Sequence, residues 1–371
     1  MKFTISGKDL KTALGRIISI SDKKVSHGQL NECLFKVNKN KIQILSTDNE
    51  IFAKVNIEGN SDSEFEFSTN SKSLFDIVKE LTDENLYFEL LSDNNILKLS
   101  TRNSFYQLLT YNNEAFNFCP FPHSVETIVI SRLSLLQMLS LTSYAVSNDE
   151  TRIYLNGLFL QEVNESLRMV ATDGHRLSML EAEFSGSGND YLLNGVILPK
   201  KGIQELKRIC ESKDVDKLEI YIDDTFIYVK NNSDYELSIR QITRDYPKYQ
   251  AVIPSKTKTN FSVDKNSFFD AVKRIKVISN EKSNQIRLSI GKGQAELSAN
   301  HPSLGKAKEI VPIKYEGDSL EIGFNAKYLV DALGVINEDE VLFELNNEIS
   351  PIVLKSPNQP NYLGIIMPLK L

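Results

Sequence analysis

The chain of 371 residues is too long for one ordinary domain, and its 41% hydrophobic and 25% charged residues are typical of a globular protein with several cores. No stretch approaches the roughly 20 apolar residues of a membrane span, and no apolar segment follows Met1, so we expect neither a membrane span nor a secretory signal. The net charge of -6 gives no support to nucleic-acid binding, although a basic face can exist within an acidic whole.

The first predicted elements are a short strand over 3–5 and a helix over 9–18. Ile5, Leu10 and Leu14 define a strand-to-helix frame with internal spacings of five and four residues. The same frame recurs after 125 and then after a further 133 residues, at Ile130, Leu135 and Leu139 and at Val263, Phe268 and Val272. Such recurrence predicts an internal repeat.

A second helical frame repeats in step with the first. It consists of Leu74, Ile77 and Leu81, then Ile203, Leu206 and Cys210, then Leu329, Ala332 and Ile336. An acidic residue stands at the same place in each copy, as Asp76, Glu205 and Asp331. A single match of this kind could arise by chance, but two frames that agree in three copies indicate three similar domains.

Alternating apolar stretches joined by short polar turns predict antiparallel hairpins in every copy. They cover 34–37 with 42–45, 158–160 with 167–170, and 286–290 with 294–297. Each copy then holds two helices and several antiparallel strands, so the fold class is α+β. Polar segments that contain proline mark the domain boundaries, and they divide the chain into domains at 1–125, 126–257 and 258–371.

The sequence shows little that resembles a catalytic or metal site. Its three cysteines, Cys33, Cys119 and Cys210, are odd in number and contain no C-x-x-C pair, which indicates a reducing, cytoplasmic setting. No two histidines have the i, i+4 spacing of a helical metal site, and phosphate-loop and nucleophile-elbow motifs are missing. We expect no enzyme, no metal and no cofactor.

One dense polar cluster, Ala171-Thr172-Asp173-Gly174-His175-Arg176-Leu177, leaves an alternative open. A cytoplasmic hydrolase would use Asp173 and His175 as an acid–base pair. The favoured interpretation is a turn in which Asp173 is the cap, Gly174 has a positive φ, and His175 and Arg176 form local hydrogen bonds. A third possibility, a sequence-specific DNA-binding regulator, would need a recognition helix, and no helix-turn-helix signature stands out.

The cluster, together with Arg152-Ile153-Tyr154-Leu155-Asn156-Gly157, resembles the bacterial sliding clamps, the beta subunits of DNA polymerase III. Further matching pieces follow in order along the whole chain: residues 1–4, 199–202, 246–249, 278–282, 322–325 and 367–371. The resemblance implies a non-catalytic processivity factor whose three domains form half of a ring. Two chains would join head to tail as a homodimer around double-stranded DNA, with helices lining the hole and sheets on the rim.

The resemblance also implies residue roles. DNA contacts, made to phosphates without sequence preference, would come from Lys23, Lys24, Lys72, Lys79, Tyr154, Lys200, Lys201, Lys207 and Arg208. The replicative polymerase subunit, the clamp loader, other polymerases and repair proteins would dock short linear motifs into an apolar groove. That groove would be formed by Leu155, Thr172, Gly174, His175, Arg176, Leu177, Pro247, Val252, Ile365, Met367, Pro368 and Leu369.

At the subunit interface, the resemblance places Phe105 of one chain against Val277 and Ile278 of the next. Three features depart from the family. Lys370 replaces a common arginine, Ser350-Pro351 replaces a more usual polar pair near the groove, and the loop 303–308 is basic where some relatives are acidic.

Overall fold

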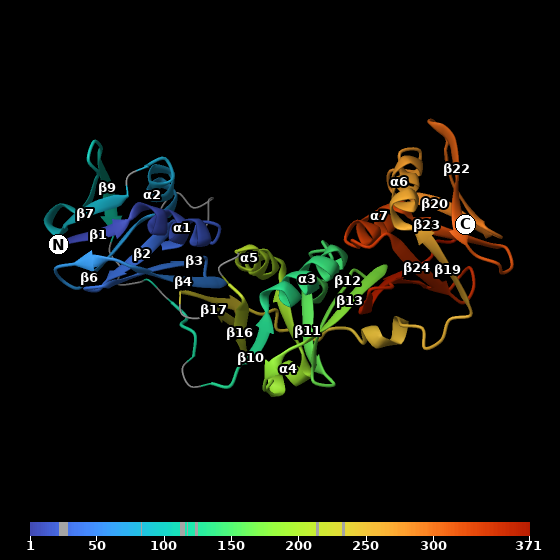
Figure 1. The fold of residues 1–371 in the computed structure, drawn as a ribbon, viewed down its shortest axis with the longest axis horizontal. Coiled ribbons are helices and arrows are strands. Elements are labelled where there is room, and N and C mark those ends of the chain that lie inside the picture. Colours follow the sequence, from blue (N-terminus) through green and yellow to red (C-terminus); the bar gives the residue numbers. More distant parts are fainter. Residues whose placement is uncertain are drawn as a thin grey trace. The chain divides into compact units, whose positions relative to one another are not determined.

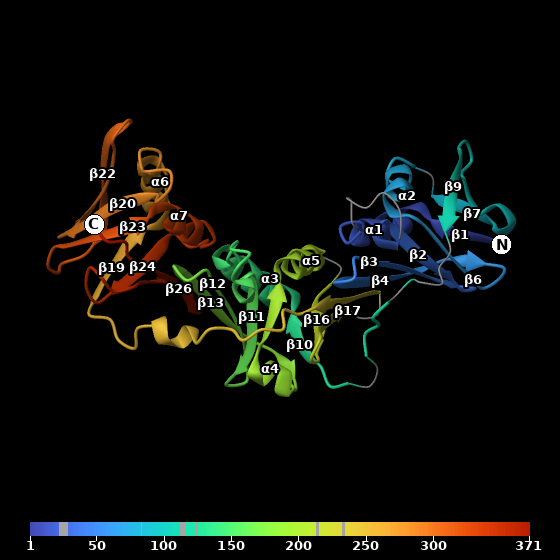
Figure 2. The same cartoon turned by 180° about the vertical axis from the view of Figure 1, so that it is seen from behind.

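The computed structural model describes residues 1–21, 29–82, 84–111, 116, 118–122, 125–212, 215–231 and 234–371 (Figures 1 and 2). They divide into two compact units. The first contains Met1–Leu133, Phe184–Leu192 and Gln204–Gln241, and the second contains Ser134–Glu183, Leu193–Ile203 and Ile242–Leu371. The central third of the chain therefore contributes to both units, and the three-domain boundaries stay a prediction.

The first unit is built on one sheet of 14 strands in the order β14-β10-β16-β17-β18-β4-β3-β2-β6-β9-β8-β7-β1-β5. Its strands are β1 (Lys2–Ser6), β2 (Glu32–Val37), β3 (Lys41–Thr47), β4 (Ile51–Glu58), β5 (Asn60–Ser61), β6 (Phe65–Asn70), β7 (Asn85–Leu91), β8 (Ile96–Ser100), β9 (Phe105–Tyr111), β10 (Ile128–Ser131), β14 (Ser185–Gly186), β16 (Lys217–Ile222), β17 (Phe226–Asn231) and β18 (Tyr235–Arg240).

The second unit is built on a sheet of 12 strands in the order β15-β11-β12-β13-β26-β25-β24-β19-β22-β21-β20-β23. Its strands are β11 (Gly157–Val163), β12 (Ser166–Thr172), β13 (Arg176–Glu183), β15 (Val196–Pro199), β19 (Thr259–Asp264), β20 (Gln285–Gly291), β21 (Gln294–His301), β22 (Gly305–Lys314), β23 (Leu320–Asn325), β24 (Glu340–Leu345), β25 (Ile352–Ser356) and β26 (Gln359–Ile366). Neighbouring strands run antiparallel, as the hairpin patterns predicted.

The helices are α1 (Gly7–Ile17), α2 (Ser71–Val78), α3 (Arg132–Thr142), α4 (Asp190–Asn194), α5 (Lys200–Glu211), α6 (Lys265–Lys276) and α7 (Ala326–Gly334). Short 3-10 turns are η1 (Gln29–Asn31), η2 (Ser92–Asn94), η3 (Ser143–Ala145), η4 (Ile153–Leu155) and η5 (Tyr249–Val252). In Figure 1, α1 lies beside α2 and α6 lies beside α7. In the described part of the chain, no helix has the length and apolar character needed to cross a membrane.

Every described helix except α4 begins directly after a strand, and the last strand residue often caps the helix. Ser6 accepts a hydrogen bond from the Asp9 amide, and Asn70 accepts one from the Ser73 amide. Asp264 caps α6, and Asn325 caps α7 in the same way. Each cap satisfies an amide that the helix cannot, which is typically worth about 1 kcal/mol.

The strand-to-helix frame predicted from the sequence is confirmed by burial, whereas Ile77 and Leu81 of the second frame are only half-buried. All nine residues of the strand-to-helix frame are buried: Ile5, Leu10, Leu14, Ile130, Leu135, Leu139, Val263, Phe268 and Val272. The predicted hairpins are also present, with Val37 opposite Ile42, Val163 opposite Ser166, and Gly291 opposite Gln294. The α+β class is therefore confirmed, and the short α4 is a helix that the pattern did not predict.

Candidate binding groove and basic helices

The second unit carries a groove of about 220 Å³ with a largely apolar lining. Its lining residues are Tyr154, Leu155, Thr172, Gly174, Arg176, Leu177, Pro247, Lys248, Tyr249, Val252, Ile365 and Met367. Pockets of this character, with few polar groups in an apolar wall, are typical of ligand sites.

Neighbouring strands bring the groove residues together. Leu177 on β13 lies opposite Thr172 on β12 and opposite Ile365 on β26. Leu177 and Ile365 also belong to a buried cluster that includes Phe159 and Tyr249. The floor of the groove is thus formed by side chains of a closely packed core.

The turn between β12 and β13 forms one rim of the groove. The Asp173 carboxylate accepts hydrogen bonds from the amides of His175 (2.9 Å) and Arg176 (3.1 Å), and the Arg176 carbonyl accepts one from the Thr172 hydroxyl (2.6 Å). Gly174 has a φ of 89°, in the left-handed region that favours glycine. The predicted turn is confirmed.

This geometry does not form the acid–base pair of a hydrolase. The second Asp173 oxygen accepts a hydrogen bond from Nε of Arg176 at 3.0 Å, while the His175 ring lies against the Tyr328 ring at 6.2 Å between centroids. Asp173 therefore serves the turn and Arg176. The hydrolase alternative finds no support here.

Arg176 is the most heavily restrained side chain of the rim. Only 7% of it is exposed, and it forms ion pairs with Asp173 (3.0 Å) and Asp331 (2.6 Å). Its guanidinium also lies over the rings of Tyr328 and Tyr144, at 4.6 Å and 5.4 Å from their centroids. A buried cation needs such partners because its desolvation is otherwise costly.

A second arginine supports the opposite wall. Arg168 on β12 donates from Nε to the Glu181 carboxylate at 2.7 Å and from a terminal nitrogen to the Tyr249 hydroxyl at 3.1 Å. Tyr249 belongs to η5, which also carries Val252. Sequence reasoning did not assign Tyr249 and Lys248 to the groove, although both lie in the matching piece 246–249.

The structure places three residues of the predicted groove outside its lining. The His175 carbonyl accepts from the Met367 amide at 2.9 Å, and the Leu369 amide donates to the Gly323 carbonyl at 2.7 Å, so Leu369 lies along β23. Pro368 follows Met367 between them. Tyr154, which the resemblance assigned to DNA, also lines the groove.

The residues assigned to DNA are found mainly on two helices. Lys72 is exposed on α2, and Lys79 at the end of α2 pairs with Asp76 at 2.8 Å. Both these residues belong to the first unit. Lys23 and Lys24 lie outside the described residues.

Helix α5 carries the other four basic residues assigned to DNA. Lys200 donates to Asn148 at 2.6 Å, and Arg208 pairs with the buried Glu205 at 3.3 Å. Burial lowers the pKa of Lys200 and of Lys207. Lys201 also lies on this helix and is half-buried.

The residues assigned to the subunit interface are accessible. Phe105 on β9 is 59% exposed and Val277 after α6 is 72% exposed, whereas Ile278 is half-buried. Leu109 lies four residues after Phe105 on the same face of β9, and it is exposed as well. Exposed apolar residues at both places are typical of a surface that another chain covers.

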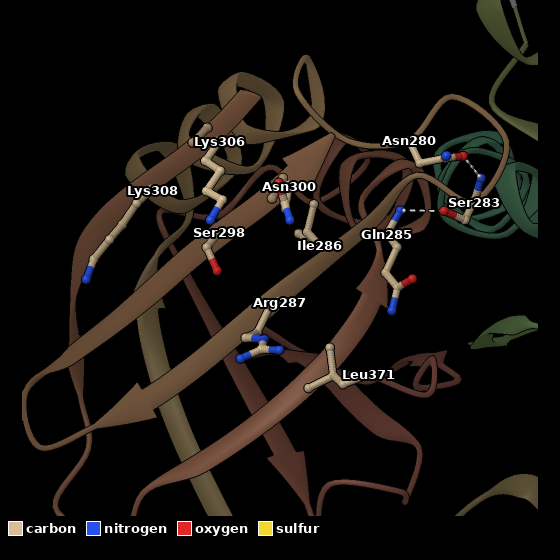
Figure 3. Close-up of a pocket in the computed structure, with 12 residues that line it drawn as sticks. Asn280, Ser283, Gln285, Ile286, Arg287, Ser298, Asn300, Lys306, Lys308 and Leu371 are labelled. Atoms are coloured by element: carbon tan, nitrogen blue, oxygen red, sulfur yellow. Dashed lines mark hydrogen bonds between the residues drawn. The ribbon is translucent and has the colours of Figure 1, made fainter. Parts of the chain in front are cut away.

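A larger concavity of about 690 Å³ is lined by residues of β20, β21 and β22, by the turn before β20 and by Leu371 (Figure 3). Arg287, Lys306, Lys308 and Leu371 border it. Arg287 faces Glu321 at 3.5 Å and Lys308 pairs with Glu296 at 2.6 Å, so much of its charge is balanced locally. The smaller groove, with its apolar floor and converging polar groups, is the better candidate site.

Comparisons with known proteins agree with these features. Models of the DNA polymerase III beta subunit match in order: the N-terminal domain over residues 1–120, the central domain over 130–248 and the C-terminal domain over 250–370. The beta sliding clamp of Caulobacter vibrioides is 29% identical, with 100% of both chains covered.

Solved structures show the same likeness. The DNA polymerase III subunit beta of Pseudomonas aeruginosa has a TM-score of 0.92 at 26% identity, with 100% of both chains covered. A sliding clamp from Bartonella birtlesii, bound to griselimycin, also has a TM-score of 0.92, at 28% identity with 100% of both chains covered. The chain thus shares the three-domain clamp fold over its whole length.

Proposed function

Because this chain belongs to the DNA polymerase III beta subunit family, we propose that two copies close head to tail into a ring around duplex DNA. The protein is a sliding clamp, which makes a polymerase processive. In this family the clamp is an accessory subunit of the polymerase that has no catalytic site of its own. Its place of action is the cytoplasm, where Cys33, Cys119 and Cys210 would stay reduced and unpaired.

The groove is the observation that supports the tethering role. Leu155, the turn after β12, η5 and the end of β26 converge on it from distant parts of the sequence. Apolar side chains including the flexible Met367 suit a surface used by several partners. Its ligands are short linear motifs of the replicative polymerase subunit, the clamp loader, other polymerases and repair proteins.

Free strand edges support ring closure. In the described strands, β9 pairs with β6 only through Thr110 and Tyr111, and β22 pairs with β19 only through Ile313 and Lys314. Along the rest of their length, the described parts of β9 and β22 pair with β8 and β21 alone, and a strand edge of this kind can pair with another chain. Pairing of β9 with β22 of a second copy would bring Phe105 toward Val277 and Ile278.

The DNA contacts are electrostatic. Lys72 and Lys79 on α2 and Lys200, Lys201, Lys207 and Arg208 on α5 would face phosphates, with Lys23, Lys24 and Tyr154 as further contacts. Phosphate contacts carry no sequence information, so binding is weak, sensitive to salt and independent of sequence. A sequence-specific regulator would instead discriminate between DNA sequences of equal length.

Retention on DNA of different topology tests the ring. The protein is loaded with a clamp loader and ATP onto nicked circular plasmid and onto the same plasmid linearised, and salt is then raised to screen phosphate contacts. A closed ring persists on circles and leaves linear DNA through the ends. Equal loss from both, with a control clamp retained, would refute the ring.

The Bartonella birtlesii clamp binds griselimycin, and we propose that this chain binds it in the groove, which makes it a probe. Titration calorimetry is expected to show binding to the wild-type protein and loss of at least tenfold in affinity for Leu177→Asp, because a carboxylate would be buried in the apolar floor. Glu321→Ala, on the outer face of the second unit, is the control and keeps wild-type affinity. Unchanged affinity of Leu177→Asp would refute the groove as the ligand site.

A further inference from the structure

We propose that Asp331 is a positioning residue of the groove: it holds the Arg176 guanidinium in the wall, and ligand affinity depends on it although it does not line the groove. This inference rests on the proposed function of the groove. Nothing in the sequence pattern joins the two residues, since Arg176 begins β13 and Asp331 lies in α7, 155 positions later.

The geometry fixes the guanidinium at two points. Nε of Arg176 donates to Asp173 at 3.0 Å, and a terminal nitrogen of the same group donates to Asp331 at 2.6 Å. A planar fork held at two of its nitrogens has a defined orientation, which a single ion pair does not impose. The rings of Tyr328 and Tyr144 then limit movement out of that plane.

Asp173 cannot replace Asp331. One oxygen of Asp173 already accepts two backbone amides of the turn, and the other accepts Nε of Arg176. Without Asp331, the terminal nitrogen of an arginine that is only 7% exposed would be deprived of a charged acceptor. Leaving a buried charge without its partner is costly, so the side chain would turn toward water and leave the groove wall.

A role confined to the stability of α7 does not account for this arrangement. Asn325 caps the start of that helix, and Asp331 lies in its interior, where its carboxylate reaches outside the helix to Arg176. Its side chain is 28% exposed, so an alanine there would leave no closed cavity. Alanine is also the best helix former, so Asp331→Ala is expected to fold.

A double-mutant cycle with griselimycin as the probe tests the inference. Titration calorimetry is performed on the full chain as wild type, Asp331→Ala, Arg176→Ala and the double variant. Asp331→Ala is expected to weaken binding about tenfold, as for the removal of a charged hydrogen bond. If Asp331 acts through Arg176, the double variant binds like Arg176→Ala alone.

Two further variants separate positioning from folding. Asp331→Glu restores a carboxylate and is expected to recover part of the affinity. Asp270→Ala removes an aspartate that pairs with Lys273 on the exposed face of α6, and it is expected to bind like wild type. The inference would be overturned if Asp331→Ala bound griselimycin like the wild type. It would also be overturned if Asp331→Ala weakened binding equally in the wild type and in Arg176→Ala.

A measurement without ligand keeps this inference distinct from the groove itself. In NMR spectra, the proton on the terminal nitrogen of Arg176 that donates to Asp331 is expected to exchange slowly with water in the wild type and rapidly in Asp331→Ala. If griselimycin binds the wild type and Leu177→Asp equally, the groove proposal fails. Proton exchange at Arg176 needs no ligand, so it still measures whether Asp331 holds the guanidinium in place. Unchanged exchange in Asp331→Ala would refute the restraint in either case.

Discussion

The guanidinium of Arg168 donates a hydrogen bond to the Tyr249 hydroxyl at 3.1 Å, across 81 positions of the chain. This interaction ties β12 to η5, which supplies part of the groove wall. Glu181, opposite Arg168 in the β12–β13 register, accepts from the same guanidinium at 2.7 Å. The wall that holds Tyr249 and Val252 therefore depends on an arginine beneath it.

Tyr249→Phe removes the hydroxyl and keeps the ring. We expect the free energy of unfolding to fall by about 1 kcal/mol, the usual worth of one hydrogen bond. Griselimycin affinity should fall a few-fold because η5 is no longer tied to β12. Urea unfolding and titration calorimetry measure the two effects. Tyr221→Phe, on β16 of the first unit, is the control, and equal behaviour of both variants would contradict the expectation.

Gly174→Ala should weaken both folding and binding. Its φ of 89° disfavours any side chain, and an added Cβ would lie 3.0 Å from a terminal nitrogen of Arg152. Gly293→Ala has a similar strain at a φ of 72°, in open space in the β20–β21 hairpin. Thermal unfolding should show a loss of about 1 kcal/mol for each, while griselimycin binding should fall only for Gly174→Ala. If Gly293→Ala lost griselimycin binding as well, the loss in Gly174→Ala could not be attributed to the rim of the groove.

Val277→Asp and Phe105→Asp should each dissociate the proposed dimer. Both side chains are more than half exposed, so a charge there spares the fold but opposes an apolar interface between copies. Sedimentation velocity should show a shift from dimer to monomer at micromolar protein. Ile349→Asp changes an apolar residue that is 86% exposed in the turn after β24, and it should remain dimeric. Replacement of the neighbouring Ile278 by aspartate tests the same surface. A dimer that persists in both Ile278→Asp and Val277→Asp would refute the proposed interface.

Lys72→Ala should reduce the salt dependence of DNA binding. Removing one lysine–phosphate interaction lowers the slope of log affinity against log salt by about 0.9, whatever the DNA sequence. Fluorescence anisotropy with a short duplex at several salt concentrations gives the slope. Lys292→Ala, in the β20–β21 turn, should leave it unchanged. A sequence-dependent decrease in affinity would instead indicate that Lys72 reads bases.

The buried thiols should make the protein sensitive to alkali. Burial raises the pKa of Cys33 and of Cys210 to about 12, above the unperturbed value of about 8.5 that an unfolded chain has. The unfolded state thus loses protons first, and folding stability falls as pH rises above about 8.5. Urea unfolding from pH 7 to 10 should show the decline, and Cys33→Ala should lessen it. At pH 8, a thiol reagent should modify Cys33 and Cys210 only after unfolding.

Interactions between residues close in sequence determine much of this fold. The strand-to-helix frame, the hairpin registers and the Asp173–Gly174 turn depend on residues close in sequence, and the structure confirms them. Family resemblance supplied most of the groove lining, because its motif residues keep their order and spacing. It did not assign Tyr249 or Lys248 to the groove, although both lie in the matching piece 246–249.

Only the tertiary structure paired Arg176 with Asp331 and Arg168 with Tyr249, and only it placed Tyr154 in the groove wall. It also divided the central third of the chain between two compact units, where the sequence predicted a boundary on each side. The physical reason is common to these cases. Periodicity and turn chemistry act over a few residues, whereas a buried ion pair forms only after packing brings together segments whose separation in the chain no local pattern encodes.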